Sequence, residues 1–373
     1  MPVTMEFDAV QLTQPWTCVF HRGRRKLAGW WRRLYRWEFW PPYLFYPPVI
    51  AYIAYLGIRF RSWTLFTAAN PAIPAGGFVG ESKHEILKRL ENVASCLPAT
   101  TLLSCEVTTQ RVAEAEEFMG RNGLDFPVVL KPDAGQRGSG VSIVRSFEHL
   151  QEYLTHTSFP VILQEYIPGK EYGVFYYRYP GEGRGRVFSV TEKRMPILFG
   201  DGKSTLEELI LADDRAVCMS TFYLQKNSER IQEVPAAGER IQLVEIGTHC
   251  RGAIFLDGKD AITPALEEAI DRIARNFDDF FFGRFDIRVP SLRDFMDGRN
   301  LKIVELNGVT SEATHIYDPK LNLFDAYRVL FEQWRIAFEI GALNCARGAR
   351  PTSAGSLLRA VREYRRLAQS YPE

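Results

Sequence analysis

Three oxygen-bearing side chains stand in two short apolar segments near the C-terminal end of the chain. Asp286 lies in RFDIRV (284–289), and Glu305 and Asn307 lie in LKIVELN (301–307). Glu305 and Asn307 are two residues apart, so on a strand they share one face. If the two segments pair, the three side chains converge and supply the oxygen ligands that Mg²⁺ takes, with phosphates and water completing its shell. Acids inside apolar strands cost free energy unless they bind metal or are paired, so a structural ion pair is the alternative.

A glycine-rich stretch, KPDAGQRGSGV (131–141), follows an apolar segment earlier in the chain. Lys131 ends the predicted strand 124–131 and supplies a positive charge. Glycines let backbone N–H groups approach phosphate oxygens without a Cβ in the way. The pattern predicts a phosphate-binding loop; a glycine-rich hairpin with a surface lysine is the alternative. The residues expected to bind phosphate are Lys131, Gly135, Gly138, Ser139 and Gly140.

A third polar segment, QEYIPGKEYGV (164–174), joins the end of one predicted strand to the start of another. Backbone groups and a polar side chain at a strand end can bind an adenine edge, and the Glu171 carboxylate can accept hydrogen bonds from ribose hydroxyls. A hairpin with solvated acids is the alternative. The residues expected to contact the nucleoside are Gln164, Glu165, Tyr166, Ile167 and Glu171.

The segment FGDGKST (199–205) ends like a Walker A loop but does not complete one. That motif needs a glycine five residues before Gly202, and this position holds Ile197. The segment is interpreted as a turn, with Ser204 capping a helix over 206–211.

The composition limits the classes of function. The 373 residues suffice for roughly two or three domains, and the net charge of +1 gives no argument for nucleic acid as a partner. Six cysteines without a C-x-x-C pair favour a reducing compartment over a disulfide framework. The N-terminal stretch MPVTMEFDAV lacks the basic region of a secretory signal. A cytoplasmic location is expected.

Residues 21–58 combine a basic stretch with an apolar one. HRGRRKLAGWWRRLYR (21–36) contains seven Arg or Lys and no acid, and residues 39–58 carry no charge. Two Pro-Pro pairs, at 41–42 and 47–48, prevent one long helix, and a span needs about 20 apolar residues. The pattern fits an element at the inner face of the membrane; packing of these aromatics on the main domain is the alternative. The oligomeric state cannot be read from the sequence.

Alternating apolar segments predict an α+β fold with antiparallel strand pairs. The clearest predicted elements are strands over 171–177, 186–192, 284–289 and 301–306 and a helix over 264–277. A capping box, Ser82 with Glu85, predicts the start of another helix. The expected domains are a basic and aromatic N-terminal region and candidate membrane-interface element (1–75), a reduced region with a linker helix (76–125), a nucleotide-binding domain (126–325) and C-terminal helices (326–373).

Taken together and in this order, the three polar segments resemble the ATP-grasp superfamily over residues 82–319. The resemblance implies two α+β lobes enclosing ATP, with Mg²⁺ or Mn²⁺ held by Asp286, Glu305 and Asn307. It further implies that Arg284 lies beside a tetrahedral intermediate, as in D-alanine–D-alanine ligases. Lys193 and Arg194 are similar to basic residues that face the phosphates in cyanophycin synthetase-like ligases. The N-terminal region departs from the family because it lacks a complete substrate-binding domain.

The resemblance implies an ADP-forming ligase. A carboxylate is phosphorylated by ATP to an acyl phosphate, which an amine then attacks. Both substrates are small molecules whose identity the sequence does not give. A phosphotransferase on the same fold is the alternative, and a nucleotide-binding regulatory module is a third. His249 and Arg251 face either an acidic substrate or structural partners.

Overall fold

The structure is a computed structural model that describes residues 29, 31–33, 35–104, 107–135 and 138–369. Contacts divide the chain into two compact units. One consists of Met195–Val244 with the described residues up to Trp40, and the other of Pro41–Arg194 with Glu245–Glu373, of which residues 370–373 lie outside the description. The α+β fold with antiparallel strand pairs is confirmed.

The strands form three sheets. The large sheet has the order β11-β10-β5-β6-β9, the small sheet has the order β1-β4-β2-β3, and β7 pairs with β8 in the other unit. The strands are β1 (Thr100–Leu103), β2 (Val128–Pro132), β3 (Ser142–Val144), β4 (Val161–Glu165), β5 (Lys170–Tyr177), β6 (Arg186–Arg194), β7 (Ile197–Phe199), β8 (Arg240–Gln242), β9 (Ile254–Asp257), β10 (Phe282–Val289) and β11 (Lys302–Asn307).

The helices are α2 (Pro42–Phe45), α3 (Pro47–Arg59), α4 (Lys83–Lys88), α5 (Thr108–Asn122), α6 (Phe147–Thr155), α7 (Leu206–Ala212), α8 (Ser220–Lys226), α9 (Pro264–Arg275), α10 (Leu292–Met296), α11 (Leu323–Ala346) and α12 (Ala354–Ala368). Short 3₁₀ helices include η2 (Leu65–Ala68), η6 (His249–Arg251) and η8 (Thr314–Tyr317). The predicted start of α4 is confirmed, because the Ser82 side chain accepts a hydrogen bond from the Glu85 amide. Among the described residues, no helix is long and apolar enough to cross a bilayer.

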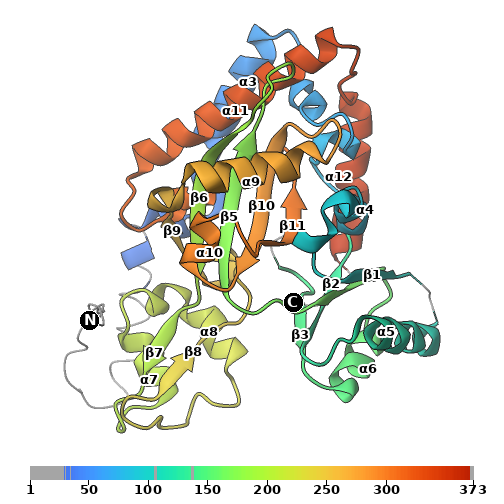
Figure 1. Cartoon of the computed structure of the whole chain (residues 1–373). Coiled ribbons are helices and arrows are strands. Elements are labelled where there is room, and N and C mark those ends of the chain that lie inside the picture. The colour runs from blue at the N-terminus through green and yellow to red at the C-terminus, as the bar shows by residue number, and fades with distance from the viewer. Residues whose placement is uncertain (1–28, 30, 34, 105–106, 136–137, 370–373) are drawn as a thin grey trace, which may run out of the picture. The chain divides into compact units, whose positions relative to one another are not determined.

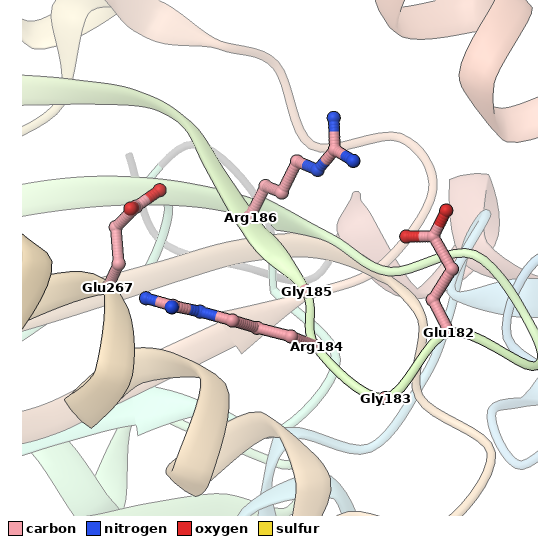
Figure 2. A pocket seen from close by; sticks show the side chains of 6 residues that line it. All are labelled: Glu182, Gly183, Arg184, Gly185, Arg186 and Glu267. Atoms are coloured by element: carbon pink, nitrogen blue, oxygen red, sulfur yellow. The ribbon is translucent and has the colours of Figure 1, made fainter.

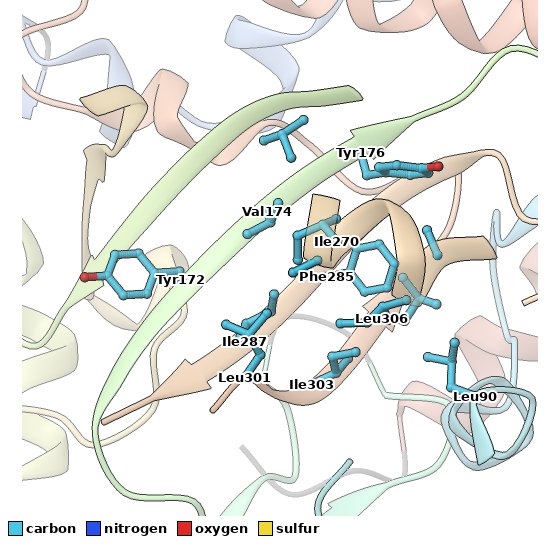
Figure 3. Close-up of a cluster of buried hydrophobic side chains, with 14 of the residues drawn as sticks. Leu90, Tyr172, Val174, Tyr176, Ile270, Phe285, Ile287, Leu301, Ile303 and Leu306 are labelled. Carbon is cyan, nitrogen blue, oxygen red and sulfur yellow. The ribbon is translucent and has the colours of Figure 1, made fainter. Parts of the chain in front are cut away.

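One face of the large sheet is mostly apolar and is covered by α9 and α10 (Figure 1). Thr263 caps α9 and Pro264 fills its first position, and Leu266, Ile270 and Ile273 then recur at helical spacing toward the sheet. They pack on alternate residues of the strands, among them Tyr172, Val174, Phe285 and Ile287 (Figure 3). This cluster fixes the strands that position the candidate site.

The opposite face of the large sheet changes character along its length. At one end Phe175 and Phe282 pack against α3, η2 and α11, through Leu56, Phe66 and Phe338 among others. At the other end the same face carries charged residues. Because successive side chains of a strand point to opposite faces, the charges share a face with these phenylalanines and not with Phe285 or Ile287.

The segment 199–205, which was interpreted as a turn and not as a Walker A loop, folds as a turn in the unit that contains β7 and β8. Asp201 accepts hydrogen bonds from the amides of Lys203 and Ser204. The helix that follows, α7, is capped by Thr205 in a complete capping box with Glu208. The expected cap, Ser204, was therefore one residue too early, because its hydroxyl is engaged by Asp201.

Candidate functional site

The register of β10 against β11 brings four predicted site residues to one face of the large sheet. Asp286 lies directly opposite Glu305, and Arg284 lies opposite Asn307. In antiparallel strands, directly opposed side chains project from the same face. On the other side of β10, Gly173 of β5 lies opposite Asp286, where a Cβ would come within 3.4 Å of the Asp286 carboxylate. The predicted convergence is therefore present in the structure.

Asp286 is the most buried acid of this group, and two cations compensate its charge. Arg284 donates from Nε to Oδ1 at 2.9 Å and from Nη2 to Oδ2 at 3.2 Å, and the Lys193 ammonium lies 3.2 Å from Oδ2. Burial by itself would raise the pKa of Asp286, but Arg284 and Lys193 more than offset this and lower the pKa to about 2. Asp286 is thus ionised throughout the physiological range.

Glu171, which the sequence suggested as a ribose ligand, is held by two cations on the same face. Lys193 Nζ lies 2.8 Å from Oε1, and Arg288 Nη2 lies 3.0 Å from Oε2. Lys193 therefore bridges Glu171 and Asp286, and buried ion pairs of this kind need such shared hydrogen bonds to offset desolvation. Arg288 also donates to the Ile167 carbonyl at 2.8 Å and so ties the expected adenine-binding segment to β10.

Glu305 is paired with a cation, whereas the Asn307 amide nitrogen has no partner among the described residues. Lys83 lies 2.7 Å from Glu305, and although burial would raise the pKa of Glu305, Lys83 keeps that pKa below its usual value. Asn307 Nδ2 is buried and has no hydrogen-bond partner among the described residues. An unpaired buried amide costs free energy, which marks this position as one that a ligand would complete.

A bulge in β11 connects the small sheet to these residues. The register shifts between Asp286 and Ile287, leaving Val304 as an extra residue of β11. Its carbonyl accepts a hydrogen bond from Lys131 Nζ at 3.0 Å, and Lys131 also donates to Gln164 Oε1 at 2.9 Å. Burial lowers the pKa of Lys131 to about 8, although Glu305 partly opposes the shift. Lys131 thus lies at the end of β2, beside the acids of the large sheet.

The glycine-rich loop between β2 and β3 is described except for residues 136–137. Gly138 and Gly140 have φ angles of 75° and 68°, which favour glycine. A Cβ on Gly138 would come within 3.0 Å of Thr248 Cγ2. Gly135 and Ser139 complete the described part of the loop. The segment 246–248 therefore lies against this loop, and Gly247 in turn approaches Glu171, with a Cβ-to-Oε2 distance of 3.0 Å.

The expected adenine-binding residues follow directly in the chain. Gln164 is buried and donates to Thr100 Oγ1 at 3.1 Å, besides accepting from Lys131. Glu165 accepts from the Ala99 amide at 3.0 Å. The Arg288 guanidinium lies over the Tyr166 ring, with its carbon 5.4 Å from the ring centroid. Ile167 is buried. The Gln164 side chain is thus engaged by Lys131 and Thr100.

Arg194 is the predicted site residue that the structure does not bring to the others. It follows Lys193 directly, so its side chain projects from the opposite face of β6. There it forms two hydrogen bonds with Glu192, at 2.9 and 2.8 Å, and remains largely exposed.

Two cations of the face, Lys83 and Arg288, were missed from the sequence. Arg288 is two residues from Asp286, so strand periodicity would have identified it. Lys83 gives no comparable signal, because it reaches Glu305 through the tertiary packing of α4 on β11.

The residues present fit a divalent cation with a polyphosphate. No group of three His, Cys, Asp or Glu in the described part of the chain could hold a metal by itself. Asp286, Glu305 and Asn307 supply two carboxylates and an amide, and nucleotide-bound Mg²⁺ typically takes one or two carboxylates together with phosphates. The unpaired Asn307 amide supports the fit, because turning its oxygen toward a cation would direct its Nδ2 to a phosphate or water.

Comparisons with known proteins return ligases. No family model matches the chain. Cyanophycin synthetases from Trichormus variabilis and a Nostoc species are each 32% identical over 101 residues, which make up 26% of this chain and 10% of theirs. The chain is similar to ATP-grasp ligases. The cyanophycin synthetase match agrees with the similarity to cyanophycin synthetase-like ligases noted from the sequence.

Among solved structures, the D-alanine–D-alanine ligase of Bacillus anthracis matches with a TM-score of 0.41 at 15% identity, covering 72% of this chain and 69% of that one. The VanG D-Ala:D-Ser ligase of Enterococcus faecalis has a TM-score of 0.38 at 14% identity, with coverages of 68% and 61%. The bifunctional glutathione synthetase of Pasteurella multocida has a TM-score of 0.37 at 17% identity, with coverages of 67% and 36%. The match thus spans about a third of the glutathione synthetase and a tenth of the cyanophycin synthetases.

A recess at the β5–β6 connection is separate from these residues. It has a volume of about 520 Å³ and is lined by Glu182, Gly183, Arg184, Gly185, Arg186 and Glu267 (Figure 2). It lies at the start of β6, whereas Lys193 lies near the end of that strand. None of the predicted site residues lines it.

Proposed function

We propose that this chain is an ATP-dependent ligase that joins a carboxylate to an amine and releases ADP and phosphate. The observation that carries the proposal is the register of β10 on β11. Asp286 and Glu305, Arg284 and Asn307 share one face beside two buried lysines, Lys131 and Lys193. Burying so many ionisable groups costs free energy, and such groups concentrate where a site binds or transfers charge.

Each side chain has a role in this reaction. A substrate carboxylate oxygen attacks the γ-phosphorus of ATP, the bond to the β-phosphate oxygen breaks, and ADP leaves. Lys131 and Lys193 offset charge on the transferring group. Asp286, Glu305 and Asn307 would hold Mg²⁺, which when bound supplies further charge neutralisation at the phosphates. The amine nitrogen then attacks the acyl carbon, the bond to phosphate breaks, and the amine loses a proton to solvent. Arg284 would stabilise the oxyanion of that second step.

The test is a product analysis. The protein is incubated with ATP, Mg²⁺ and pooled carboxylates and amines, and mass spectrometry searches for a condensed product formed in step with ADP and phosphate. Hydroxylamine, added in place of the amines, should trap the acyl phosphate as a hydroxamate. Phosphate retained on a stable product would instead indicate a phosphotransferase, and AMP with pyrophosphate would exclude both reactions.

Asp286→Asn should lower turnover by about 100-fold or more, because it removes a charge that the metal requires. Asp278→Asn, at an exposed position, is the matched control and should retain activity. Circular dichroism must show both variants folded, since the substitution also leaves Lys193 and Arg284 less compensated. Unchanged turnover in folded Asp286→Asn would remove this residue from the site.

A further inference from the structure

The segment that follows β11 crosses the charged face of the large sheet. Its first contact is with β10, where Arg284 Nη1 donates to the Glu312 carbonyl at 3.2 Å. It then reaches β6, where the Thr314 and Thr191 hydroxyls lie 3.0 Å apart. Finally it reaches β9, where Asp318 accepts from the Asp257 amide at 2.8 Å. The side chains of this crossing segment therefore border the site next to Arg284.

Glu312 in this segment carries a carboxylate that two tyrosines orient. Tyr46 donates to Oε1 at 2.6 Å, and Tyr317 donates to Oε2 at 3.0 Å. The side chain is half-buried, and within the described residues no Lys, Arg or His forms an ion pair with it. Arg284 donates only to its backbone carbonyl, and its charge, which also acts on Glu312, is hydrogen-bonded to Asp286.

Another glutamate of the same unit, Glu339, has a structural role and provides a comparison with Glu312. Glu339 accepts a hydrogen bond from Tyr179 at 2.6 Å, as Glu312 does from Tyr46, but it also pairs with Arg335 at 2.7 Å. Glu312 has the phenols without the cation. A half-buried carboxylate without a directly paired cation costs free energy, and a bound cation would offset this cost.

Further aromatic rings pack against the two tyrosines that hold the carboxylate. His249 of η6 stacks on Tyr317 with centroids 4.4 Å apart, and the Phe45 ring lies 6.4 Å from Tyr317 and 5.0 Å from Tyr46. Aromatic rings are compatible with a neighbouring cation, so this packing agrees with a positively charged ligand. An anion would instead be repelled by the carboxylate.

We propose that Glu312, held between Tyr46 and Tyr317, binds a positively charged group of the amine substrate. This inference rests on the proposed ligase function, because it assigns the acceptor side of the same site. The cation recognised is an ammonium or guanidinium group, and it brings the attacking nitrogen toward Arg284. Tyr46 and Tyr317 act as positioning residues. The linker between α2 and α3 would thereby contribute, through Tyr46, to substrate selection.

The experiment measures binding of simple cations to the full chain in the presence of ATP and Mg²⁺. The probes are 1,4-diaminobutane and methylguanidinium, with acetate as the anion, followed by saturation-transfer NMR. Wild type and Glu339→Gln, the matched control, should bind the cations. Glu312→Gln retains an oxygen that accepts from tyrosine and loses only the charge, so its Kd for the cations should rise about tenfold. Tyr46→Phe should raise the same Kd about threefold, because the carboxylate loses one of its two orienting bonds.

Each other outcome has a defined meaning. Equal cation binding in Glu312→Gln and wild type, no binding of either cation to wild type, or acetate binding that depends on Glu312 would overturn the inference. ATP binding is measured by calorimetry on the same samples. Absence of ATP binding in wild type contradicts the proposed function itself, whereas ATP binding without cation binding contradicts only the role of Glu312.

Discussion

Lys131 is a buried cation whose hydrogen-bond partners carry no charge. Its two hydrogen bonds go to uncharged oxygens of Gln164 and Val304, and burial lowers its pKa to about 8 from 10.5. The folded chain thus binds this proton more weakly than the unfolded chain. The group therefore makes the free energy of unfolding increase as the pH rises from about 8 to about 10.5. Bound phosphates would raise the pKa and so favour the charged form.

We expect ATP binding at pH 8 to take up about half a proton through Lys131. Calorimetry in two buffers of different ionisation enthalpy measures the uptake. Lys131→Met should bind ATP more weakly and lose the uptake, while Lys170→Met, at an exposed position on β5, should keep both. The same uptake in Lys131→Met and wild type would show that another group titrates.

Strand periodicity explains which site residues the sequence could and could not provide. Asp286, Glu305 and Asn307 were found because alternate residues of a strand share a face. The same rule separates Lys193 from its neighbour Arg194. Glu312 and Tyr46 were not found, since 266 residues separate them and their meeting depends on tertiary packing. Glu171 was assigned to ribose, whereas in the structure it is paired with Lys193 and Arg288.

At the level of elements, a close backbone contact fixes the end of β11. Gly308 follows Asn307 directly, and the Gly76 carbonyl accepts a hydrogen bond from the Val309 amide at 3.0 Å. A Cβ on Gly308 would contact the Gly76 carbonyl oxygen and lie 2.7 Å from Cα of Gly77. Both neighbours are backbone atoms, which cannot move as the end of a flexible side chain can.

Gly308→Ala should therefore lower the free energy of unfolding by about 1–3 kcal/mol, as overpacking does. Urea denaturation followed by circular dichroism measures the change. Gly120→Ala, in α5, introduces a Cβ with no heavy atom within 4 Å and should be neutral or slightly stabilising. If both variants are as stable as wild type, the contact between residues 76 and 308 is looser than described.

The predicted elements of the large sheet are those with strong local patterns. The strands expected at 171–177, 186–192, 284–289 and 301–306 correspond to β5, β6, β10 and β11 within a few residues, and the helix expected at 264–277 corresponds to α9. The β11 bulge was not predicted, because register depends on the partner strand and leaves no mark in a single sequence. The same holds for the crossing segment that carries Glu312.

At the scale of the molecule, α3 has two apolar faces. Val49 and Leu56 are buried, as is the neighbouring Phe45, so part of the 39–58 segment packs on the main unit. Ile50, Tyr55 and Ile58 project outward and are 62%, 51% and 68% exposed. Exposed apolar residues gathered on one element mark an interaction surface. The basic residues 21–28 lie outside the described part of the chain, so membrane contact stays a prediction.

We expect the full chain to bind anionic liposomes and to dissociate partly as salt increases, because the basic residues contribute electrostatically. Ile50→Ser with Ile58→Ser should reduce co-sedimentation several-fold. Val234→Ser, which changes an exposed apolar residue outside the 21–58 segment, should leave it unchanged. Sedimentation that is insensitive to the α3 changes, or a protein that stays in the supernatant at low salt, would rule out this surface as the membrane contact.

Inherited substitutions should have different effects on the two faces of the large sheet. Along β10, Phe285 and Ile287 lie in the apolar cluster, while Arg284 and Asp286 lie among the charges. Variants at Phe285 and Ile287 would lower the stability of the protein and thus its amount in the cell. Variants at Arg284 and Asp286 would lower the activity of each molecule. Alternate positions along β10 would then be under selection for stability and for activity. Natural sequences that keep the reaction should therefore retain Arg284 and Asp286, while the apolar positions exchange one apolar residue for another.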